Sequence, residues 1–328
     1  MSVKISSDNR PDPGPSPDHP DYSKPNVRQS GTWTHAKLGA HETYLKGFAI
    51  AAKRSPHRIY LDLFCGPGKN KAGGTIFDGS PLIALAIDPP FTHCVFVDRD
   101  PRSIATLRKH IKNEFPNHPA QIITAAGDCN QLLPALLKQL PHDGATFAFE
   151  DPDGVNIDWR TVVALARHKG DHPWKVEQFI LFQYHGLVRL LSPEKPSFQS
   201  KMVPALNTIF GNEDWRRDLQ HHGQRVRGEE LRRALITRYV AQLHGLGYKH
   251  VDELLIRKPD GHPLYYLVFA SDHEIGDKIM RSAFGQDHGS QLPLLRAPYR
   301  SIQQPLYRRV PELDRFALRA VPEDEEPS

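Results

Sequence analysis

Apolar runs and amphipathic stretches alternate along the middle of the chain. Short apolar runs, rich in β-branched and aromatic residues, cover residues 58–64, 93–98, 120–128, 145–151 and 178–184. Between them, apolar side chains recur at helical spacing over residues 80–87, 101–111, 130–140 and 158–168. This alternation predicts an α/β fold, a doubly wound, mostly parallel sheet with helices on both faces.

The segments before and after these alternating strands and helices also have apolar patterns that predict secondary structure. Residues 34–54 place Leu38, Leu45 and Phe48 at roughly helical spacing, which predicts a helix capped by Thr34, with His35 and His41 at its surface. Residues 251–271 contain two strand-like runs joined by the turn sequence KPDGH, which predicts a C-terminal antiparallel hairpin. Caps are expected at Ser80, Asp100 and Asp158.

Residues 192–245 interrupt the alternation and predict a helical, Arg-rich insertion. Within it, residues 228–247 favour one long amphipathic helix that ends at Gly245 or Gly247. Its arginines could bind phosphate, but the acids interspersed among them favour a solvated, salt-bridged surface. The arginines are Arg216, Arg217, Arg225, Arg227, Arg232, Arg233 and Arg238.

Length and composition indicate one domain over residues 31–285. Residues 1–30 hold six prolines and few large apolar side chains, so we expect a disordered tail, and residues 286–328 a loosely ordered one. The 328-residue chain has a mean hydropathy of -0.52 and neither a bilayer-length apolar run nor a secretory signal. We therefore expect a cytoplasmic protein that does not enter membranes.

Charge and cysteine content restrict the partners only weakly. The excess of 42 Lys and Arg over 38 Asp and Glu is compatible with a nucleic-acid partner without requiring one. Cys65, Cys94 and Cys129 lie too far apart for a CxxC pair or a zinc cluster, so we expect three reduced thiols and no metal.

The run YLDLFCGPGKN, residues 60–70, indicates a ligand-binding turn after the first strand. Gly66 and Gly68 follow Asp62 and leave backbone N–H groups accessible to a ligand. A dinucleotide fingerprint would require a third glycine where Lys71 stands, and a Walker loop is absent as well. The glycines could also form a tight turn with no ligand.

The pattern D-x-F-x-G-x-G, the acid at Asp98 and the GDCN run together resemble Rossmann-like (class I) S-adenosylmethionine-dependent methyltransferases. The resemblance implies that the glycine turn runs beside the methionine part of the cofactor. Asp98 would hold the ribose hydroxyls and Asp128 would lie beside the adenine. The implied cofactor-binding residues are Asp62, Phe64, Gly66, Gly68, Asp98, Asp128 and Cys129.

A narrower resemblance covers residues 33–285. The runs WTHAKLGAHETYL, DGSPLIAL, EDPDG, FGNEDW and LYYLVFASDHEIGDKIM, in this order, are similar to the three-Cys-motif partner proteins. That family implies a companion protein with a three-cysteine motif, of the iron-sulfur, radical type. Two functions remain open: a methyltransferase of unknown acceptor, nucleic acid included, or a non-catalytic subunit that kept the fold.

Asp151 is the candidate catalytic residue because it ends an apolar strand and begins the DPDG run. Its carboxylate should lie at the carboxyl edge of the sheet and hold the donor group of a methyl acceptor. Asp153 stands where the family has an aromatic residue, and an aspartate cannot stack on a base. The alternative for the DPDG run is an ordinary turn.

Residues 69–79, which follow the glycine turn, could form either a lid or a surface loop without a role.

Overall fold

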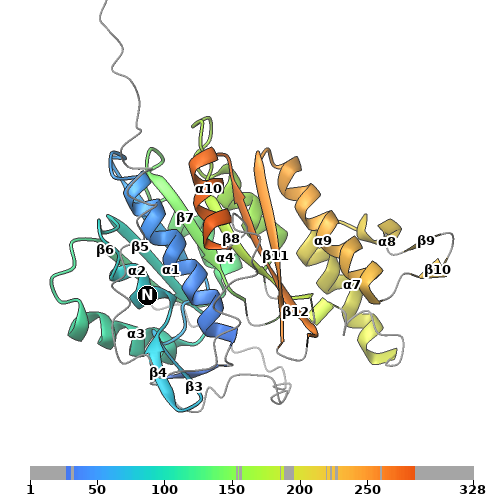
Figure 1. The fold of residues 1–328 in the computed structure, drawn as a ribbon, viewed down its shortest axis with the longest axis horizontal. Helices are drawn as coiled ribbons and strands as arrows, with labels where there is room; N and C mark the ends of the chain where they lie inside the picture. Colours follow the sequence, from blue (N-terminus) through green and yellow to red (C-terminus); the bar gives the residue numbers. More distant parts are fainter. Residues whose placement is uncertain are drawn as a thin grey trace, which may run out of the picture.

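A seven-stranded mixed sheet forms the centre of the computed structural model (Figure 1). The order across the sheet is β11-β12-β8-β7-β2-β5-β6, and β12 runs antiparallel to both of its neighbours. The structure describes residues 27–30, 33–152, 154, 157–184, 186–187, 196–218, 220–221, 224–225, 228–258 and 261–284.

Five strands lie where the apolar runs predict them, and they pair in parallel. The predicted C-terminal hairpin is also confirmed, as β11 and β12. The bounds are β2 (Arg58–Asp62), β5 (His93–Asp98), β6 (Gln121–Ala126), β7 (Ala145–Glu150), β8 (Glu177–Phe182), β11 (His250–Arg257) and β12 (Pro263–Ser271). The predicted fold class is therefore correct.

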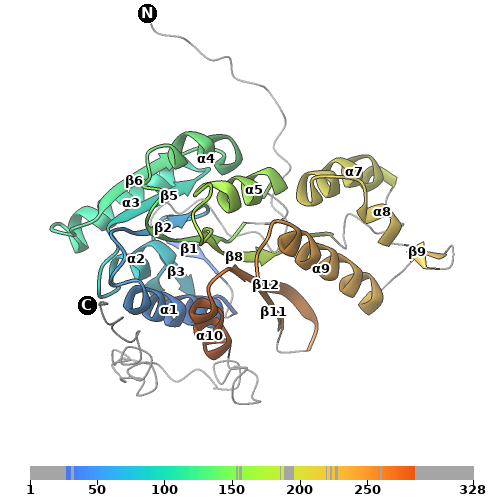
Figure 2. The same ribbon diagram turned by 90° about the horizontal axis from the view of Figure 1, so that it is seen from above.

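Helices cover both faces of the sheet, since the apolar side chains of its strands alternate between the two faces. One face packs against α1 (Trp33–Ala51), α2 (Ser80–Leu85), α3 (Pro101–Glu114) and α10 (Glu274–Ala283). The other packs against α4 (Cys129–Leu137), α5 (Trp159–Arg167), α7 (Pro196–Phe210) and α9 (Gly228–Gly245). Figure 2 shows α1 and α10 on one side and α4, α5 and α7 on the other.

The insertion is helical, as predicted. It contains α7, α8 (Trp215–Asp218), the short pair β9 (Gln220–His221) and β10 (Gln224–Arg225), and α9. The helix α9 ends at Gly245, and Gly247 then takes a φ of +90° that allows the chain to turn away. No helix in the described ranges has the length and apolar character needed to span a membrane.

Residues 69–79 form a regular element rather than an irregular loop. They fold into an antiparallel hairpin, β3 (Lys69–Ala72) and β4 (Thr75–Asp78), whose turn uses Gly73 and Gly74 at positive φ. The strand β1 (Arg28–Gln29) pairs with β3, so these two residues of the predicted disordered tail have regular structure. The rest of that tail, residues 1–26, and the C-terminal tail lie outside the described residues.

Two of the predicted helix caps are confirmed and two are wrong. The carboxylates of Asp100 and Asp158 accept from the N–H groups of Arg102 and Arg160 at the starts of α3 and α5. In contrast, Thr34 lies inside α1, and Gly79 is the N-cap of α2. The Ser80 hydroxyl instead bonds the buried carboxyl of Asp62.

Candidate functional site

Four predicted acids come together at the carboxyl edge of the sheet. Asp62 and Asp98 are the last residues of β2 and β5, Asp151 directly follows β7, and Asp128 lies two residues beyond β6. Because these four strands are parallel, their carboxyl ends meet at one edge. The structure therefore gathers the sequence-predicted residues on one side of the sheet.

The glycine turn after β2 is joined directly to Asp98. The N–H of Gly66 donates to one carboxylate oxygen of Asp98 over 2.9 Å, and the N–H of Asp100 donates to the other over 2.8 Å. Two backbone donors thus fix the orientation of a group suited to a pair of hydroxyls.

Packing as well as ligand access explains the two glycines. Gly66 and Gly68 adopt φ values of +62° and +93°, which strain residues that carry a Cβ. A Cβ at Gly68 would lie 2.9 Å from Leu107 Cδ1 of α3, whereas at Gly66 the nearest atom, on Arg28, is 3.8 Å away. Cys65, directly before Gly66, is buried, as predicted for a small apolar residue. A Cβ at Gly66 would therefore make only an ordinary van der Waals contact, whereas Gly68 is required by the packing of α3.

Asp62 is fully buried beneath the turn. It accepts from the Phe64 N–H over 3.2 Å and from the Tyr60 hydroxyl over 3.3 Å. Burial raises the pKa of the Asp62 carboxyl to about 7, the hydrogen bond from Ser80 opposes the rise, and the charge of Asp151 adds to it. Asp62 is therefore an acid that changes charge near neutral pH.

The residues after β6 are divided between capping and packing. The Asp128 carboxylate accepts from the Asn130 N–H over 2.9 Å and caps α4. The Cys129 side chain is buried, and burial together with the charges of Asp128 and Glu150 raises the pKa of its thiol to about 12. Phe64 is partly buried against the apolar clusters on this face of the sheet. The structure thus assigns Asp128 to helix capping and Cys129 and Phe64 to packing. The adenine contact implied for Asp128 stays a prediction.

Asp151 has a partner that the sequence did not reveal. The ammonium of Lys37 in α1 donates to its carboxylate, and both side chains are about nine-tenths buried, at 9% and 11% exposure. The loop beyond is held by Gln183, whose amide donates to the Pro152 carbonyl over 3.1 Å. Asp153, which bears on base stacking, lies outside the described residues.

The same face of α1 carries a second polar contact to the site. His41 is fully buried, although its prediction was a surface position, and its Nε2 lies 3.0 Å from the Tyr60 hydroxyl. Burial, with a smaller effect of the Lys37 charge, lowers the pKa of His41 to about 3. The ring packs on Phe149, with centroids 4.3 Å apart. Neutral His41 and Tyr60 thus connect α1 to Asp62.

A signal for these residues was present in the sequence. Lys37, His41 and Tyr44 recur at i, i+4 and i+7, the spacing of one helix face, and lie close to the apolar positions Leu38 and Leu45. Polar residues on the buried stripe of a helix require partners in the interior. That requirement would have suggested contacts with acids such as Asp151.

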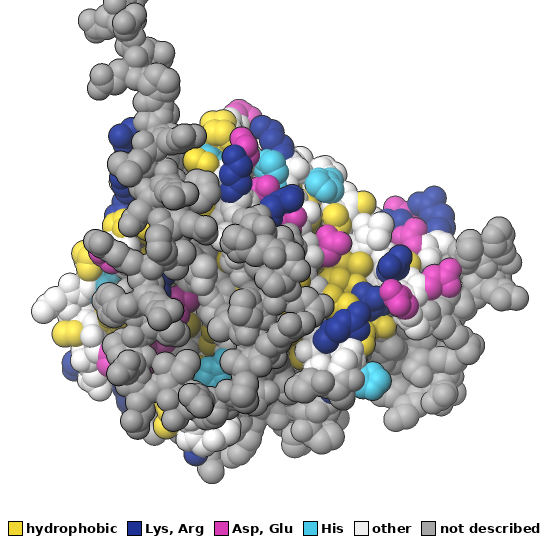
Figure 3. Space-filling view, in the orientation of Figure 1, with side chains coloured by type: hydrophobic (Ala, Val, Ile, Leu, Met, Phe, Trp, Pro, Cys, Tyr) yellow, Lys and Arg dark blue, Asp and Glu magenta, His cyan; other side chains and the backbone are white. Residues whose placement is uncertain are grey.

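The arginines of the insertion are largely neutralised by neighbouring acids. Figure 3 shows basic and acidic side chains intermixed over α9 and β11. Five of the seven have described side chains, and each forms an ion pair: Arg216–Glu213, Arg217–Asp214, Arg232–Glu229, Arg233–Glu229 and Arg238–Asp218. Arg225 and Arg227 have no described side chains. The described part of this surface is salt-bridged, which was the favoured prediction.

Comparison with known proteins adds little at the sequence level. No family model matches this chain, and no curated protein matches it. Membership of the three-Cys-motif partner family is therefore not shown.

Remote matches among solved structures concern the fold alone. Trm1 from Pyrococcus horikoshii in complex with S-adenosyl-L-methionine matches with a TM-score of 0.43 and 11% identity, over 81% of this chain and 61% of that one. The O-methyltransferase from Bacillus cereus in complex with SAH matches with a TM-score of 0.35 and 13% identity, over 72% and 80%. TYW2 from M. jannaschii in complex with AdoMet matches with a TM-score of 0.35 and 11% identity, over 76% and 77%. This chain spans about three fifths of the length of the Trm1 structure.

Proposed function

We propose that this protein binds S-adenosylmethionine at the carboxyl edge of the sheet and transfers its methyl group to a nucleophile. The observation that carries the proposal is the contact between the Gly66 N–H and the Asp98 carboxylate at the ends of two adjacent parallel strands. It places the glycine turn, which carries no side chain at Gly66, beside a carboxylate suited to paired hydroxyls.

The chemistry of the residues at this edge fits the cofactor. Asp98 would hold the ribose hydroxyls, and the turn at Gly66 would lie beside the methionine part. The cofactor carries an ammonium and a sulfonium, and Asp62 and Asp151 supply carboxylates at the same edge. A cation beside Asp62 would favour its ionised form. The bound cofactor would supply an electrophilic methyl group.

Asp151 would orient the methyl acceptor. Transfer forms a bond between the nucleophile and the methyl carbon, breaks the carbon–sulfur bond and leaves a neutral thioether, while the nucleophile loses a proton. Asp151 could accept a hydrogen bond from the N–H or O–H of the acceptor and take that proton. Because Lys37 already bonds Asp151, the acceptor must share the carboxylate with this ammonium or displace it. The nucleophile remains open, and nucleic acid is one candidate.

A transfer assay tests this proposal. The full chain is incubated with S-adenosylmethionine labelled at the methyl group and with an extract of the native cell, and labelled macromolecules and small molecules are separated. We expect label to be transferred by the wild type but not by Asp151→Asn, which keeps its affinity for the cofactor. Full activity in Asp151→Asn would reject the role of Asp151.

One observation favours a second function, a non-catalytic subunit. The Lys37 ammonium occupies the carboxylate that would hold the acceptor, so this edge can serve binding without transfer. On this alternative the chain is the partner of an iron-sulfur, radical-type protein with a three-cysteine motif, as the resemblance implies. Co-purification from the native cell separates the two functions: the alternative expects such a protein in stoichiometric amount and no label transfer by the isolated complex.

A further inference from the structure

A cavity lies at the opposite, amino-terminal edge of the sheet, where β7 begins at Ala145 and β8 at Glu177. Its volume is about 330 Å³, which is within the range of small-molecule sites. The Gly66 turn and Asp151, at the carboxyl ends of the strands, are not among its lining residues. The cavity is therefore separate from the proposed cofactor site.

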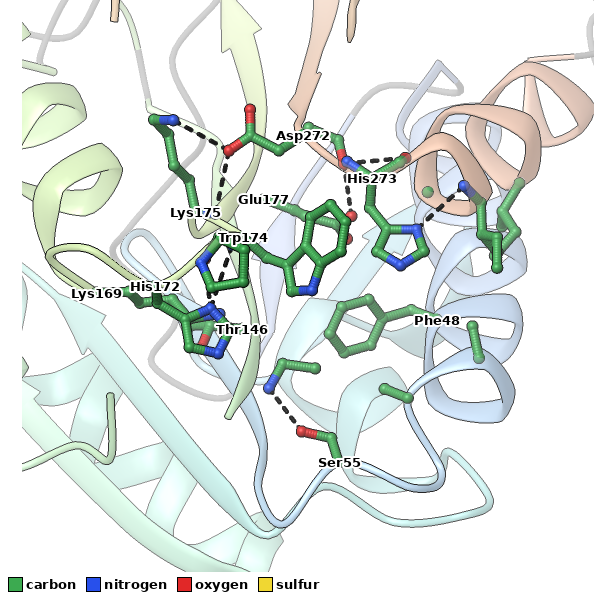
Figure 4. Close-up of a pocket in the computed structure, with 18 of the residues that line it drawn as sticks. Phe48, Ser55, Thr146, Lys169, His172, Trp174, Lys175, Glu177, Asp272 and His273 are labelled. Atoms are coloured by element: carbon green, nitrogen blue, oxygen red, sulfur yellow. Dashed lines mark hydrogen bonds and ion pairs between the residues drawn. The ribbon is translucent and has the colours of Figure 1, made fainter. Parts of the chain in front are cut away.

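Aromatic rings form one wall of this cavity. Figure 4 shows Phe48, Trp174 and His273 gathered around its interior, contributed by α1, the segment before β8 and the segment before α10. The Trp174 and His273 rings have centroids 4.7 Å apart, and the indole is 41% exposed. A large exposed aromatic side chain beside a cavity provides a surface on which a planar ring can stack.

The carboxylates that line the cavity and are buried already have partners. Glu177 accepts hydrogen bonds from the hydroxyls of Tyr44 and Ser271. Asp272 accepts from the backbone N–H groups of Lys175 and Lys249 and pairs with the Lys175 ammonium over 3.1 Å. Their hydrogen-bonding capacity is used by the protein, so neither is poised to receive a ligand cation.

Lys169 differs from these groups. It lines the cavity and is only 5% exposed, yet its ammonium makes no hydrogen bond or ion pair with any residue that the structure describes. The charges of Glu177, Asp143 and Asp272 act on this ammonium, but no hydrogen bond or ion pair joins it to them. A largely buried cation without a direct contact is costly, and an anion brought into contact with it would remove much of that cost. The cavity therefore combines an aromatic wall with one largely buried cation that makes no hydrogen bond or ion pair with the described residues.

We propose that this cavity binds a small, planar aromatic anion, whose ring stacks on Trp174 and whose carboxylate or phosphate pairs with Lys169. The assignment is independent of the methyl-transfer proposal.

Charges around Lys169 give the site a pH dependence. Burial lowers the pKa of the Lys169 ammonium to about 8, and the nearby carboxylates oppose the shift. The titratable and charged groups around it are Asp143 before β7, Glu177 on β8, Asp272 after β12, and His168, His172 and Lys175 between α5 and β8. Because only the protonated amine pairs with an anion, affinity should fall as the pH rises above about 8.

Three matched probes test the charge preference on the full chain: naphthalene-2-carboxylate, the neutral naphthalene-2-carboxamide and the cation 2-naphthylmethylammonium. Calorimetric titration at pH 7 should show that the carboxylate binds most tightly, by about tenfold or more over the amide. Lys169→Met and Lys169→Gln should bring the carboxylate to the affinity of the amide, and Trp174→Ala should weaken both. The matched control Lys138→Met, an exposed residue at the end of α4, should leave all affinities unchanged.

Several outcomes would overturn the proposal. They are equal or tighter binding of the amide or the amine, unchanged carboxylate affinity in both Lys169 variants, or no binding of any probe at millimolar concentration. The two substitutions remove an unpartnered buried charge, so circular dichroism should show a retained fold. Saturating S-adenosylhomocysteine should not compete with the carboxylate, and competition would assign the probe to the other edge.

Discussion

The ammonium of Lys37 bonds the carboxylate of Asp151 across 114 positions of sequence. The contact joins the first long helix to the end of a central strand, with both side chains largely withdrawn from water. Removing one member of such a buried pair leaves an uncompensated charge, which costs more than the pair contributes. The contact therefore bears on both folding and the chemistry of this edge.

The first prediction concerns the stability that depends on this pair. Lys37→Met should lower the free energy of unfolding by about 3–5 kcal/mol, because it leaves the Asp151 carboxylate buried and unpaired. Adding Asp151→Asn should restore part of the loss. Urea denaturation measures both, with Lys46→Met on the exposed face of α1 as a control expected to stay within about 0.5 kcal/mol of wild type. Equal effects of the Lys37 and Lys46 substitutions would contradict this prediction.

The second prediction concerns pH and Asp62. Its folded-state pKa of about 7 lies above the ordinary aspartate value of 3.8, so between these pH values the folded state holds a proton that the unfolded state has lost. The stability contributed by Asp62 is therefore present below pH 4 and disappears as the pH rises through 7. Asp62→Asn should remove this dependence.

The pH dependence due to Asp62 is measured as the difference in stability between the wild type and Asp62→Asn. His41, with a pKa lowered to about 3, gives the opposite slope, because the unfolded state binds its proton below about pH 6.5. The stability of Asp62→Asn relative to wild type should thus rise between pH 4 and 7, by a few kcal/mol at most. Denaturation midpoints that differ by a constant amount over this range would exclude a raised pKa at Asp62.

The sequence predicted the sheet and most of the acids at its edge, because strand length, helical spacing and parallel pairing are local or topological rules. Asp98 and Asp151 lie where those rules place them. The sequence did not predict that Lys37 and His41 are buried against Asp151 and Tyr60. These contacts with the ends of β7 and β2 depend on how α1 packs on the sheet. The hairpin β3–β4 was missed because its polar strands lack an apolar alternation.

The third prediction separates fold from binding at the glycine turn. Gly68→Val should destabilise the protein, because its Cβ would lie 2.9 Å from Leu107 and its φ of +93° disfavours a β-branched residue. Gly66→Ala meets no atom closer than 3.8 Å and should cost less. Thermal melts of both variants test this, and equal melting temperatures would contradict the packing role of Gly68.

The fourth prediction concerns the Arg-rich insertion. Since its described arginines pair with acids, Arg216→Gln combined with Arg217→Gln should leave any retention of RNA or DNA in a low-salt gel shift unchanged. A phosphate-binding surface would instead lose affinity in this variant and in rising salt. Loss of retention in the double variant would restore a nucleic-acid role for the insertion.

Calorimetric titration of the full chain with S-adenosylhomocysteine tests the central claim most directly. We expect saturable binding by the wild type and a loss of about tenfold or more in Asp98→Ala, which removes the proposed acceptor of the ribose hydroxyls. Asp100→Ala, which removes the cap of α3 and the pair with Arg102 but keeps the backbone N–H that bonds Asp98, should bind as the wild type does. Absence of heat from the wild type at millimolar ligand, or equal affinity in Asp98→Ala, would contradict a cofactor site at this edge.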